Sequence, residues 1–600
     1  FDNLDTNLYT DFIKANTLKH DQITSDANRI LAHKFDLLGS GEYDFGKKIQ
    51  WLTDFKSGHT WDRKYYKYIK IIDFNNNSDA KVPWELSRFQ HLITLGKAYL
   101  ISKDEKYALE FKEQIEDWLR ENPYLMSVNW SCTMDVSIRS VNWILGYYFF
   151  KDSKNIDGVF IKKFNQSLYL HGVYIINNLE NKGGHTGNHY LSDIVGLIWL
   201  GLYFKDIAPK NLKAKFRPRY WLDFGISELE KEMQVQVNED GTHYETSTSY
   251  HRLVTELFLL TSIVLKNNAC CISSMFISRL EKMCEFLMHL TKPNGNSPLI
   301  GDADNGRFVI LSDYYSWKKD DFRHLMSIAG EFFNRDDFRL YGIDFIEDAL
   351  LATGTYKFIN TNDNFDSVIK RFSLPSTSFA IGGYYILRND RIQCFIRCGE
   401  LALRGHGGHS HNDQLSFELN IDGEDIAIDP GNYVYTSDYK MRNLFRSTKY
   451  HNTVVVNGYE QNDINEFDLF RLNEQTFAKC KEFSPDRFVG IHYGYKEKCG
   501  IIHERTIELH DDKIVITDTL IGSKANEENW FSNLVLSKDI EPAETNNLCY
   551  LTSSSKKFYL SYSANTKPEI RDTYFSKSYG VLEKCKSISL KSSSMTIGIL

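Results

Sequence analysis

Apolar positions follow two different periods along the chain. In the first 350 or so residues they recur every three to four positions, as expected for helices. In one such helix, the apolar face consists of Phe276, Leu280, Met283, Leu287 and Leu290. Residues 191–204 and 251–265 are apolar nearly all round, which predicts helices buried on more than one side. Many helices in tandem predict paired helical hairpins wound into a solenoid or toroid.

After about residue 375 the apolar period falls to two. In QLSFELNIDGEDIAIDPG, apolar and polar residues alternate up to Ile421, Asp422-Gly423 supplies a hairpin turn, and Ile426 continues the return strand. The sequence therefore predicts an α+β multidomain protein, with an N-terminal helical domain (residues 1–360) and a C-terminal antiparallel β-sandwich (residues 375–600). The boundary is predicted in the polar stretch 360–378.

The composition narrows the class of partner. Six hundred residues exceed one hydrophobic core, and 42% apolar with 25% charged residues is ordinary globular composition. A net charge of −8 argues against nucleic acid, but it does not exclude an acidic polysaccharide, since a local cluster of Arg, His and Asn suffices. No run of about 18 apolar residues predicts a membrane span. The chain starts at Phe1 without a signal peptide, so export cannot be read from it.

Two polar clusters each stand directly before an apolar helix. In NKGGHTGNHYLSD, glycines such as Gly187 permit unusual backbone angles that aim Asn188 and His189; the alternative is that Asn188 only caps the helix. In NEDGTHYETSTSYHRL, a tyrosine can serve as general acid, or as base if cations lower its pKa. The alternative there is a capped helix start with Tyr250 as packing.

A third cluster, GHGGHSHND, holds His406, His409 and His411 beside glycines. If this loop is extended, His409 and His411 point to the same side. This spacing suits two ligands on one metal, or one ligand beside one catalytic imidazole. With Asp429 and His451 on neighbouring strands, the donors make a plausible zinc shell of nitrogen and oxygen ligands.

These segments together resemble the heparinase II/III-like polysaccharide lyases. GGHSHNDQLSFELNIDGEDIAIDPGNYVY and FRSTKYHNTVVVNG are similar to that family's β domain. KVPWELSRF, NWSCTMDVSIRSVNWI, GNHY, DGTHYETSTSYH and GDADNGR resemble the helical domain of its heparinase III branch. The likeness covers roughly residues 80–460 and implies an incomplete α/α toroid followed by a β-sandwich, with the active site in the cleft between them.

The resemblance also implies roles for matching residues. Asn188 matches the residue that neutralises the substrate carboxylate, and His409 matches the catalytic histidine. Tyr250 best matches the catalytic tyrosine, although Tyr244 is so near in the sequence that a shifted alignment would assign this role to Tyr244. The residues that match metal ligands, usually of a structural zinc, are His411, Asp429 and His451. Residues expected to contact the acidic sugars are His189, Tyr244, Glu245, Arg88, Arg139, Trp84 and Tyr433. For Arg88, Arg139, Trp84 and Trp143, helix packing or surface ion pairing is the alternative.

The implied reaction is β-elimination on a uronate polymer, with heparan sulfate as the leading substrate and alginate, hyaluronan or bacterial capsule as the alternatives. Asn188 would donate a hydrogen bond to the carboxylate and so stabilise the negative charge that develops there. His409 as base and Tyr250 as acid would act from opposite sides of the sugar ring. The two roles can also reverse, or tyrosine can serve in both. The resemblance implies a periplasmic or secreted enzyme. Rival readings are a zinc-dependent hydrolase, a non-catalytic carbohydrate-binding protein, and a glycoside hydrolase using Asp135 and Glu245.

Overall fold

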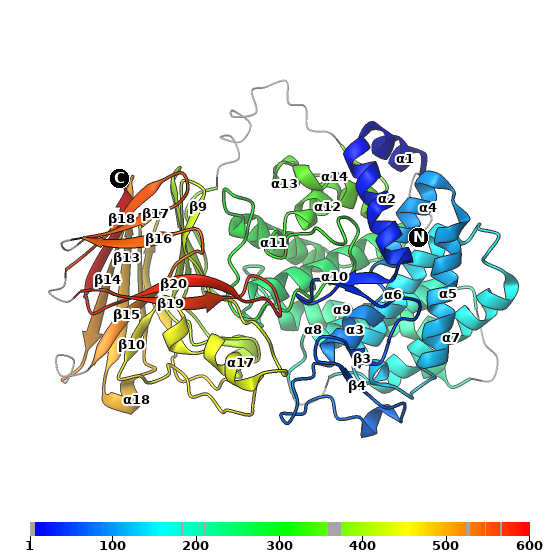
Figure 1. The fold of residues 1–600 in the computed structure, drawn as a ribbon, viewed down its shortest axis with the longest axis horizontal. Coiled ribbons are helices and arrows are strands. Elements are labelled where there is room, and N and C mark those ends of the chain that lie inside the picture. Colours follow the sequence, from blue (N-terminus) through cyan, green and yellow to red (C-terminus); the bar gives the residue numbers. More distant parts are fainter. Residues whose placement is uncertain are drawn as a thin grey trace.

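Two regions of different secondary structure meet side by side in the computed structural model (Figure 1). The structure describes residues 6–181, 184–207, 212–357, 374–523, 529–545, 548–563 and 567–600. Among the described residues, the last helix of the helical region ends at Thr353, and the first strand of the β region begins at Thr377. Much of the predicted boundary stretch 360–378 lies outside the described residues, because these stop at 357 and resume at 374.

Helices form the N-terminal region, as the 3.6-residue period predicts. The longer ones are α1 (Thr6–Ala15), α2 (Thr17–Leu31), α3 (Lys81–Ser87), α4 (Leu92–Ser102), α5 (Glu105–Glu121), α6 (Thr133–Phe150), α7 (Gly158–Asn177), α8 (Asn188–Tyr203), α9 (Pro218–Gln236), α10 (Thr248–Asn267), α11 (Ser274–Leu290), α12 (His324–Phe333), α13 (Asp336–Tyr341) and α14 (Ile346–Thr353). Two small hairpins precede α3: β1 (Lys34–Asp36) with β2 (Glu42–Asp44), and β3 (Thr53–Asp54) with β4 (His59–Thr60).

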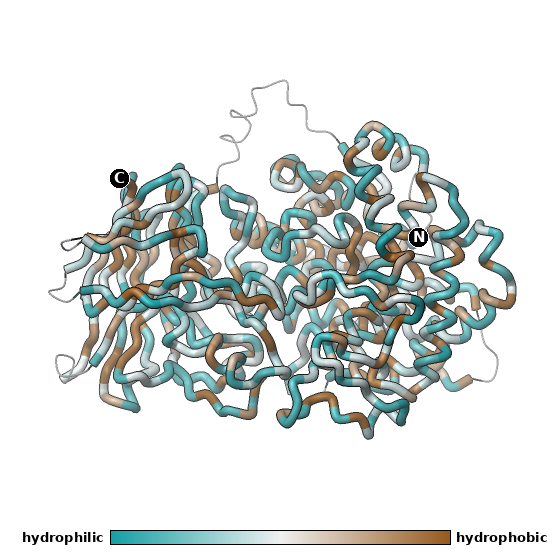
Figure 2. Tube along the Cα trace, in the orientation of Figure 1, coloured by the Kyte–Doolittle hydropathy of each residue, from teal (hydrophilic) through white to brown (hydrophobic). Residues whose placement is uncertain are grey.

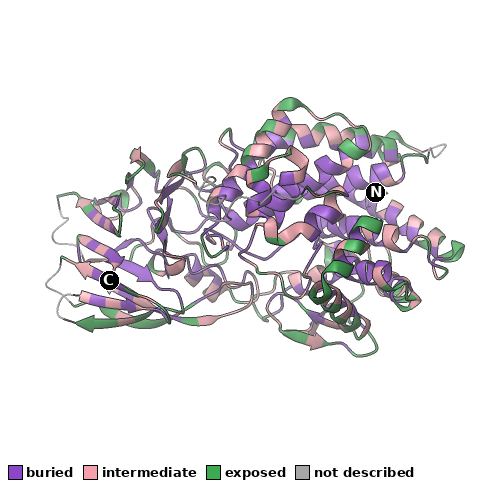
Figure 3. Cartoon of the chain, turned by 90° about the horizontal axis from the view of Figure 1, so that it is seen from above, coloured by how far each residue is buried: buried purple, intermediate pink, exposed green. Residues whose placement is uncertain are grey.

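The helices pair into hairpins arranged in two layers. The inner helices α4, α6, α8 and α10 contact one another in that order, and α5, α7, α9 and α11 follow them on the outside. The inner helices α8 and α10 are buried on nearly every side, as their uniform apolar sequences predict, and Figure 3 shows buried helices surrounded by partly exposed ones. Helix α1 contacts both α4 and α14, so the N-terminal helices lie between the first and the last helices of the ring.

Antiparallel sheets form the C-terminal region. A five-stranded sheet has the strand order β5 (Thr377–Phe379), β6 (Tyr384–Arg388), β7 (Ile392–Arg397), β8 (Phe417–Ile421), β9 (Glu424–Ala427). A four-stranded sheet has the order β10 (Val454–Val456), β15 (Trp530–Val535), β20 (Glu583–Leu590), β19 (Glu569–Phe575). An eight-stranded sheet has the order β11 (Lys479–Ser484), β12 (Arg487–His492), β13 (Ile502–Leu509), β14 (Lys513–Ile521), β21 (Ser594–Ile599), β18 (Lys557–Tyr562), β17 (Leu548–Thr552), β16 (Glu541–Thr545). Short helices α16 (Ala402–Gly405), α17 (Tyr439–Phe445) and α18 (Lys496–Cys499) interrupt the strands.

The sheets pack as a sandwich. Strands β13 and β17 bury every second residue, whereas β8 and β10 are buried along their whole length. Along β13 buried and partly exposed residues alternate without a break. Figure 2 shows hydrophobic and hydrophilic residues interspersed along the strands of the β domain. One apolar core joins residues of all three sheets. The β8–β9 hairpin turns at Asp422 and Gly423, whose φ values of 52° and 87° are those of a tight type I′ turn. The predicted architecture of helical domain and β-sandwich is confirmed.

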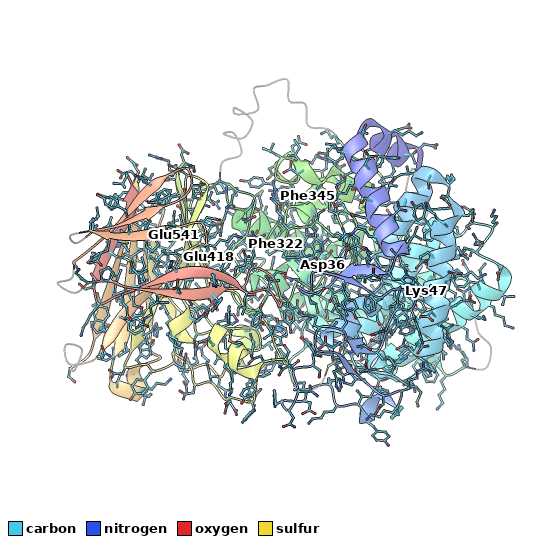
Figure 4. All side chains as sticks on the ribbon, viewed as in Figure 1. Asp36, Lys47, Phe322, Phe345, Glu418 and Glu541 are labelled. Carbon is cyan, nitrogen blue, oxygen red and sulfur yellow. The ribbon has the colours of Figure 1, made fainter. Side chains whose placement is uncertain are left out.

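Polar contacts hold the two domains together. Lys292 Nζ donates to Glu418 Oε2 at 2.6 Å; Figure 4 labels Glu418 on the β domain, opposite the helical region. Elsewhere the Tyr579 hydroxyl donates to Asp79 Oδ2 at 2.5 Å, and Thr246 and Ser410 hydroxyls lie 3.0 Å apart. An ion pair and several hydrogen bonds therefore fix the two domains against each other. No helix in the described ranges has the length and apolar character needed to cross a membrane.

Candidate active site

A cavity of about 360 Å³ lies where the two domains meet. Its helical-domain lining includes Lys81, Trp84, Arg88, Cys132, Asp135, Asn188, His189, Tyr250 and Asp304. Its β-domain lining includes Leu403, Gly408, His409, Tyr435, Thr436 and Phe470. The structure thus brings Asn188, Tyr250 and His409, three residues of different predicted motifs, to one cavity.

Tyr250 lies in the first turn of α10. The Ser247 side chain caps this helix by accepting a hydrogen bond from the Tyr250 amide at 3.1 Å, so the cap fixes where the tyrosine emerges. The hydroxyl donates to Asp304 Oδ2 at 3.0 Å and lies 3.1 Å from the Tyr435 hydroxyl. Burial, together with the charges of Asp304 and Asp302, raises the pKa of Tyr250 well above its usual range. At rest, Tyr250 is therefore a neutral proton donor.

Asp304 is held by a cation. Lys81 Nζ donates at 2.7 Å to the same Asp304 oxygen that accepts from Tyr250. Although burial raises it, the charge and hydrogen bond of Lys81 hold the pKa of Asp304 well below its usual range. The carboxylate therefore stays ionised and fixes the tyrosine hydroxyl.

His409 is oriented by a second carboxylate, Asp302. His409 Nδ1 lies 3.0 Å from Asp302 Oδ2, and since a carboxylate only accepts, the ring proton sits on Nδ1. In the neutral imidazole the lone pair is then on Nε2, which lies 3.8 Å from Glu245 Oε2. Gly301 allows the approach: its φ is 75°, and a Cβ there would lie 2.8 Å from the His409 carbonyl oxygen.

Asp302 also binds two further groups. Its Oδ1 lies 2.9 Å from His411 Nε2, and its Oδ2 accepts from Arg442 Nη2 of α17 at 2.9 Å. Although burial raises it, the Arg442 charge and the hydrogen bonds of both histidines hold the pKa of Asp302 well below its usual range. The predicted orientation of His409 and His411 to the same side is observed, since both rings face this carboxylate.

Asn188 begins α8 and is paired with Glu245. Glu245 accepts from the Asn188 backbone N–H at 2.9 Å and from its side-chain Nδ2 at 2.8 Å. A Cβ at the preceding Gly187 would lie 2.4 Å from Glu245 Oε1, so a larger residue there would have to displace the carboxylate that holds Asn188. The buried Asn188 Oδ1 has no hydrogen-bond partner in the described part of the chain. The helix cap is Gly187, and no side chain caps α8.

His189 and Tyr244 flank this pair differently. His189 Nδ1 lies 3.2 Å from Glu180 Oε2, and the Glu180 charge overcomes the effect of burial and raises the pKa of His189 to about 9. His189 lines the cavity as a cation in an ion pair. Tyr244 is absent from the cavity lining; its hydroxyl donates to the Thr186 carbonyl.

Three of the sequence-predicted donors meet in a buried cluster next to the cavity. Ligand atoms of His411, Asp429 and His451 all lie within 4.8 Å of one another. His411 Nε2 faces Asp302, and His451 Nδ1 lies 2.8 Å from the Ser447 carbonyl oxygen, so both protons sit on these outer nitrogens. The inner nitrogens, His411 Nδ1 and His451 Nε2, then face each other with lone pairs at 3.2 Å.

That arrangement fits a divalent cation. Two facing lone pairs repel unless a cation lies between them, and outer partners such as a carboxylate and a carbonyl are usual for histidines that bind metals. Burial and the neighbouring Glu418 and Asp413 charges raise the pKa of Asp429 well above its usual range, so a cation is also what would keep this carboxylate ionised. His411, Asp429 and His451 are therefore a candidate metal site.

Some predicted contacts are not at the cavity. Arg139 is fully buried inside the helical domain, where its guanidinium lies 4.3 Å from the centre of the Trp118 ring and its Nε donates to His171 at 3.0 Å. Trp143 packs edge-on against Trp118 in the same core. Tyr433 packs on Phe445 and does not line the cavity. The expectation of sugar contact is corrected for Arg139, because α6 turns it inward, whereas Trp84 and Arg88 do line the cavity.

A second correction concerns the arrangement of acid and base. The Tyr250 and His409 rings are stacked, with centroids 3.8 Å apart and planes inclined by 19°. No sugar ring fits between groups in contact, so the two cannot stand on opposite faces of one sugar. They approach the cavity from the same side.

Sequence reasoning did not assign Asp302, Asp304, Lys81, Tyr435 or Arg442 to the site. The segment GDADNGR, which holds both aspartates, stood out only by its resemblance to the family. The signal that would have pointed to this segment is a pair of carboxylates separated by a single residue and flanked by glycines.

Comparison with known proteins identifies the family and supports the fold. The Heparinase II/III N-terminus family matches residues 6–322, and the Heparinase II/III-like C-terminal family matches residues 373–597. A heparin-sulfate lyase of Bacteroides stercoris is 25% identical over 527 residues, which are 81% of this chain and 70% of that protein. One from Pedobacter heparinus is 25% identical over 449 residues, 73% of this chain and 58% of that protein, so the match spans less than two thirds of that relative.

A solved heparinase III structure superposes with a TM-score of 0.68 at 18% identity, over 96% of this chain and 84% of that one, and supports the fold. The chain belongs to the heparinase II/III-like family of polysaccharide lyases.

Proposed function

We propose that this protein cleaves a uronate-containing polysaccharide of the heparan type by β-elimination and leaves an unsaturated uronate end. The observation that carries the proposal is the contact between Tyr250 and His409 in the interdomain cavity, each fixed by its own aspartate. Elimination needs a base for the acidic C5 proton and an acid for the departing O4, and this pair supplies both.

His409 is the base in this proposal. Asp302 holds the proton on Nδ1, which leaves the Nε2 lone pair to take the C5 proton and lets the carboxylate stabilise the resulting imidazolium. Tyr250 is the acid, because its neutral hydroxyl keeps its proton until O4 departs.

Asn188 and His189 meet the substrate carboxylate. Removal of the C5 proton increases negative charge on that group, and preorganised donors stabilise such charge most strongly in a site that excludes water. The Asn188 amide is held by Glu245 and has a second N–H hydrogen for the substrate, while the neighbouring His189 carries positive charge.

The stacked pair favours one uronate configuration. In a glucuronate ring with equatorial substituents, the C5–H and C4–O bonds are gauche, at about 60°, so both are reached from one side. In the C5 epimer, iduronate, these bonds can become anti, which suits an acid and a base on opposite faces. Because Tyr250 and His409 lie on the same side of the cavity, we expect glucuronate to be the preferred sugar.

The charge of the cavity favours low sulfation. Lys81 and Arg88 are the cations among the described lining residues besides histidine, and both are already paired, with Asp304 at 2.7 Å and with Asp135 at 2.6 Å. A densely sulfated chain needs free cations for its sulfates. Unsulfated or sparsely sulfated glucuronate segments fit this cavity better.

The metal, which we propose to be zinc, has a structural role. When bound, it neutralises the buried donors and fixes the loop that carries His409. His411, Asp429 and His451 are absent from the cavity lining, so a water on this metal would not meet the substrate, which disfavours a zinc-dependent hydrolase. Glu245 is likewise absent from the lining and bound to Asn188, which disfavours an Asp135–Glu245 glycosidase pair.

A long polysaccharide does not cross membranes, so we place the enzyme in the periplasm or outside the cell.

Ultraviolet absorbance of the unsaturated product tests the proposal directly. The substrates are an unsulfated glucuronate–glucosamine polymer, heparan sulfate, heparin, chondroitin, hyaluronan and alginate. We expect absorbance to rise fastest with the unsulfated polymer or heparan sulfate and slowest with heparin. New reducing ends without absorbance would instead indicate hydrolysis, and cleavage of none of these polymers would contradict the proposed substrate class.

A further inference from the structure

A second cluster of metal-binding atoms opens into the cavity itself. It consists of Cys132, Glu180 and His189, whose ligand atoms lie within 4.8 Å of one another. Cys132 precedes α6, Glu180 follows α7 and His189 lies in the first turn of α8, so three segments of the helical domain converge here. Cys132 and His189 both line the cavity.

The donor spacing is that of a tetrahedral site. His189 Nδ1 lies 3.2 Å from Glu180 Oε2 and 3.9 Å from Cys132 Sγ. Zinc bonds of about 2.0–2.1 Å to nitrogen and oxygen and 2.3 Å to sulfur, at tetrahedral angles, separate these donors by about 3.4 and 3.6 Å. The observed spacings differ from these by a few tenths of an ångström, so an ion could enter with small side-chain shifts. It would displace one proton from the His189 ring and one from the Cys132 thiol, both of which pass to solvent.

The carboxylate is already fixed for such a role. Glu180 Oε2 accepts from the Met134 backbone N–H at 3.0 Å, and the Glu180 backbone N–H donates to Asp193 Oδ2 at 2.8 Å. Hydrogen bonds of this kind orient ligating carboxylates in metal sites. Sulfur, nitrogen and oxygen donors together suit zinc and not magnesium or calcium, which prefer oxygen alone.

We propose that Cys132, Glu180 and His189 form a second, zinc-type metal site in the wall of the cleft, with its fourth position open to the cavity. This site differs from the buried His411 cluster in its thiol ligand and in its access from the cleft. A bound ion removes His189 from the carboxylate-binding position beside Asn188, and it would therefore compete with substrate. This last consequence rests on the proposed lyase function; the binding of the ion does not.

Cobalt distinguishes the two sites, because only the second has sulfur. Titration of metal-stripped full-length protein with Co²⁺ should produce a thiolate-to-cobalt charge-transfer band in the near ultraviolet. Cys132→Ser should lose this band, whereas Cys271→Ser, a change at an exposed cysteine, should keep it. Equilibrium dialysis against zinc should give two ions per chain for the native protein and one for Cys132→Ser.

Absence of the band in the native protein, or its survival in Cys132→Ser, would overturn the proposal. Circular dichroism of each variant checks that the fold is kept, and Glu180→Gln, which leaves the thiol intact, gives a second route by weakening cobalt binding without removing sulfur. Zinc should raise the apparent KM of the native enzyme and leave that of Cys132→Ser unchanged. If the band behaves as expected but no polymer is cleaved, the metal site stands and the lyase proposal alone fails.

Discussion

Tyr250 and His409 come from different domains, and their rings stack at a centroid distance of 3.8 Å. Each ring is fixed by its own carboxylate, Tyr250 by Asp304 and His409 by Asp302, and both aspartates lie in the same segment of the helical domain. The pair therefore behaves as one unit whose geometry depends on how the domains dock, and its members should be sensitive to changes made on either side.

Replacement of Tyr250 by phenylalanine should lower kcat about a hundred- to ten-thousandfold, since it removes only the proton-donating oxygen. The ring and its stacking on His409 remain, so KM and the thermal midpoint should change little. Initial rates from product absorbance give both constants.

Tyr244→Phe is the matched control, because its hydroxyl bonds a backbone carbonyl and the residue is absent from the cavity lining. A large loss of kcat in Tyr244→Phe with near-normal activity in Tyr250→Phe would exchange the roles of the two tyrosines.

The alkaline limb of the pH profile should report the environment of Tyr250. Burial and two carboxylates raise its pKa well above the usual value near 10, so the acid stays protonated and kcat/KM should not fall through tyrosine ionisation near pH 10. Asp304→Asn removes one of those negative charges and leaves Lys81 nearby, so the Tyr250 pKa should drop and the alkaline limb should move to lower pH. An unchanged limb in Asp304→Asn would show that Tyr250 is not the titrating acid.

Asp302→Asn should damage both activity and stability. The variant leaves the buried Arg442 without its anionic partner, and breaking a buried ion pair typically costs about 3–5 kcal/mol. His409 also loses the acceptor that fixes its Nδ1 proton, so kcat should fall more than KM rises. Thermal melting and steady-state kinetics test these effects, with Asp11→Asn, at an exposed site, as the control expected to change neither. A native-like melting curve for Asp302→Asn would contradict the role of this carboxylate.

Removal of the metal should lower the thermal midpoint. An ion that binds the folded state at a hundredfold excess over its Kd stabilises by about 2.7 kcal/mol. A chelator should therefore destabilise the native protein, and zinc should restore it. His451→Ala should start from the lower midpoint and respond weakly to the chelator, whereas an equal response in both proteins would exclude the His411 cluster as the binding site.

An exposed aromatic cluster beside the cavity should bind sugar rings. Phe74 of the helical domain contacts Tyr439 and Phe467 of the β domain, with ring centroids 5.5 and 5.6 Å apart, and the nearby Phe470 lines the cavity. Phe467 is 56% exposed, so Phe467→Ala should raise KM about two- to tenfold with kcat and stability nearly unchanged. Phe477, 59% exposed, offers the control, and an equal change of KM in Phe477→Ala would exclude a specific role.

Local sequence patterns predicted the helices and strands, because the residues that form a helix face or a hairpin lie close together in the sequence. The spacing of Phe276, Leu280 and Met283 predicts α11, and Asp422-Gly423 predicts the turn between β8 and β9. The family motifs also supplied Asn188, Tyr250 and His409, which the structure brings to one cavity.

Contacts between distant residues could not be predicted in this way. His409 and Asp302 are 107 positions apart, and no local spacing links an imidazole to a carboxylate over that range. Arg139 was expected to contact the acidic sugars, with helix packing as the alternative. Because α6 is buried on nearly all sides, its sequence does not reveal which flank faces a cleft. The stacking of Tyr250 on His409 likewise depends on domain docking.

Asp302 has a consequence for biosynthesis. This one carboxylate of the helical domain contacts the imidazoles of His409 and His411 and the buried Arg442, all of which lie in the β domain. During synthesis the helical half emerges first and carries Asp302 without these partners. In a ribosome-bound or half-folded chain, His409 and His411 therefore lack the carboxylate that orients them, and the proposed site is assembled only when the β domain has docked onto the helical domain.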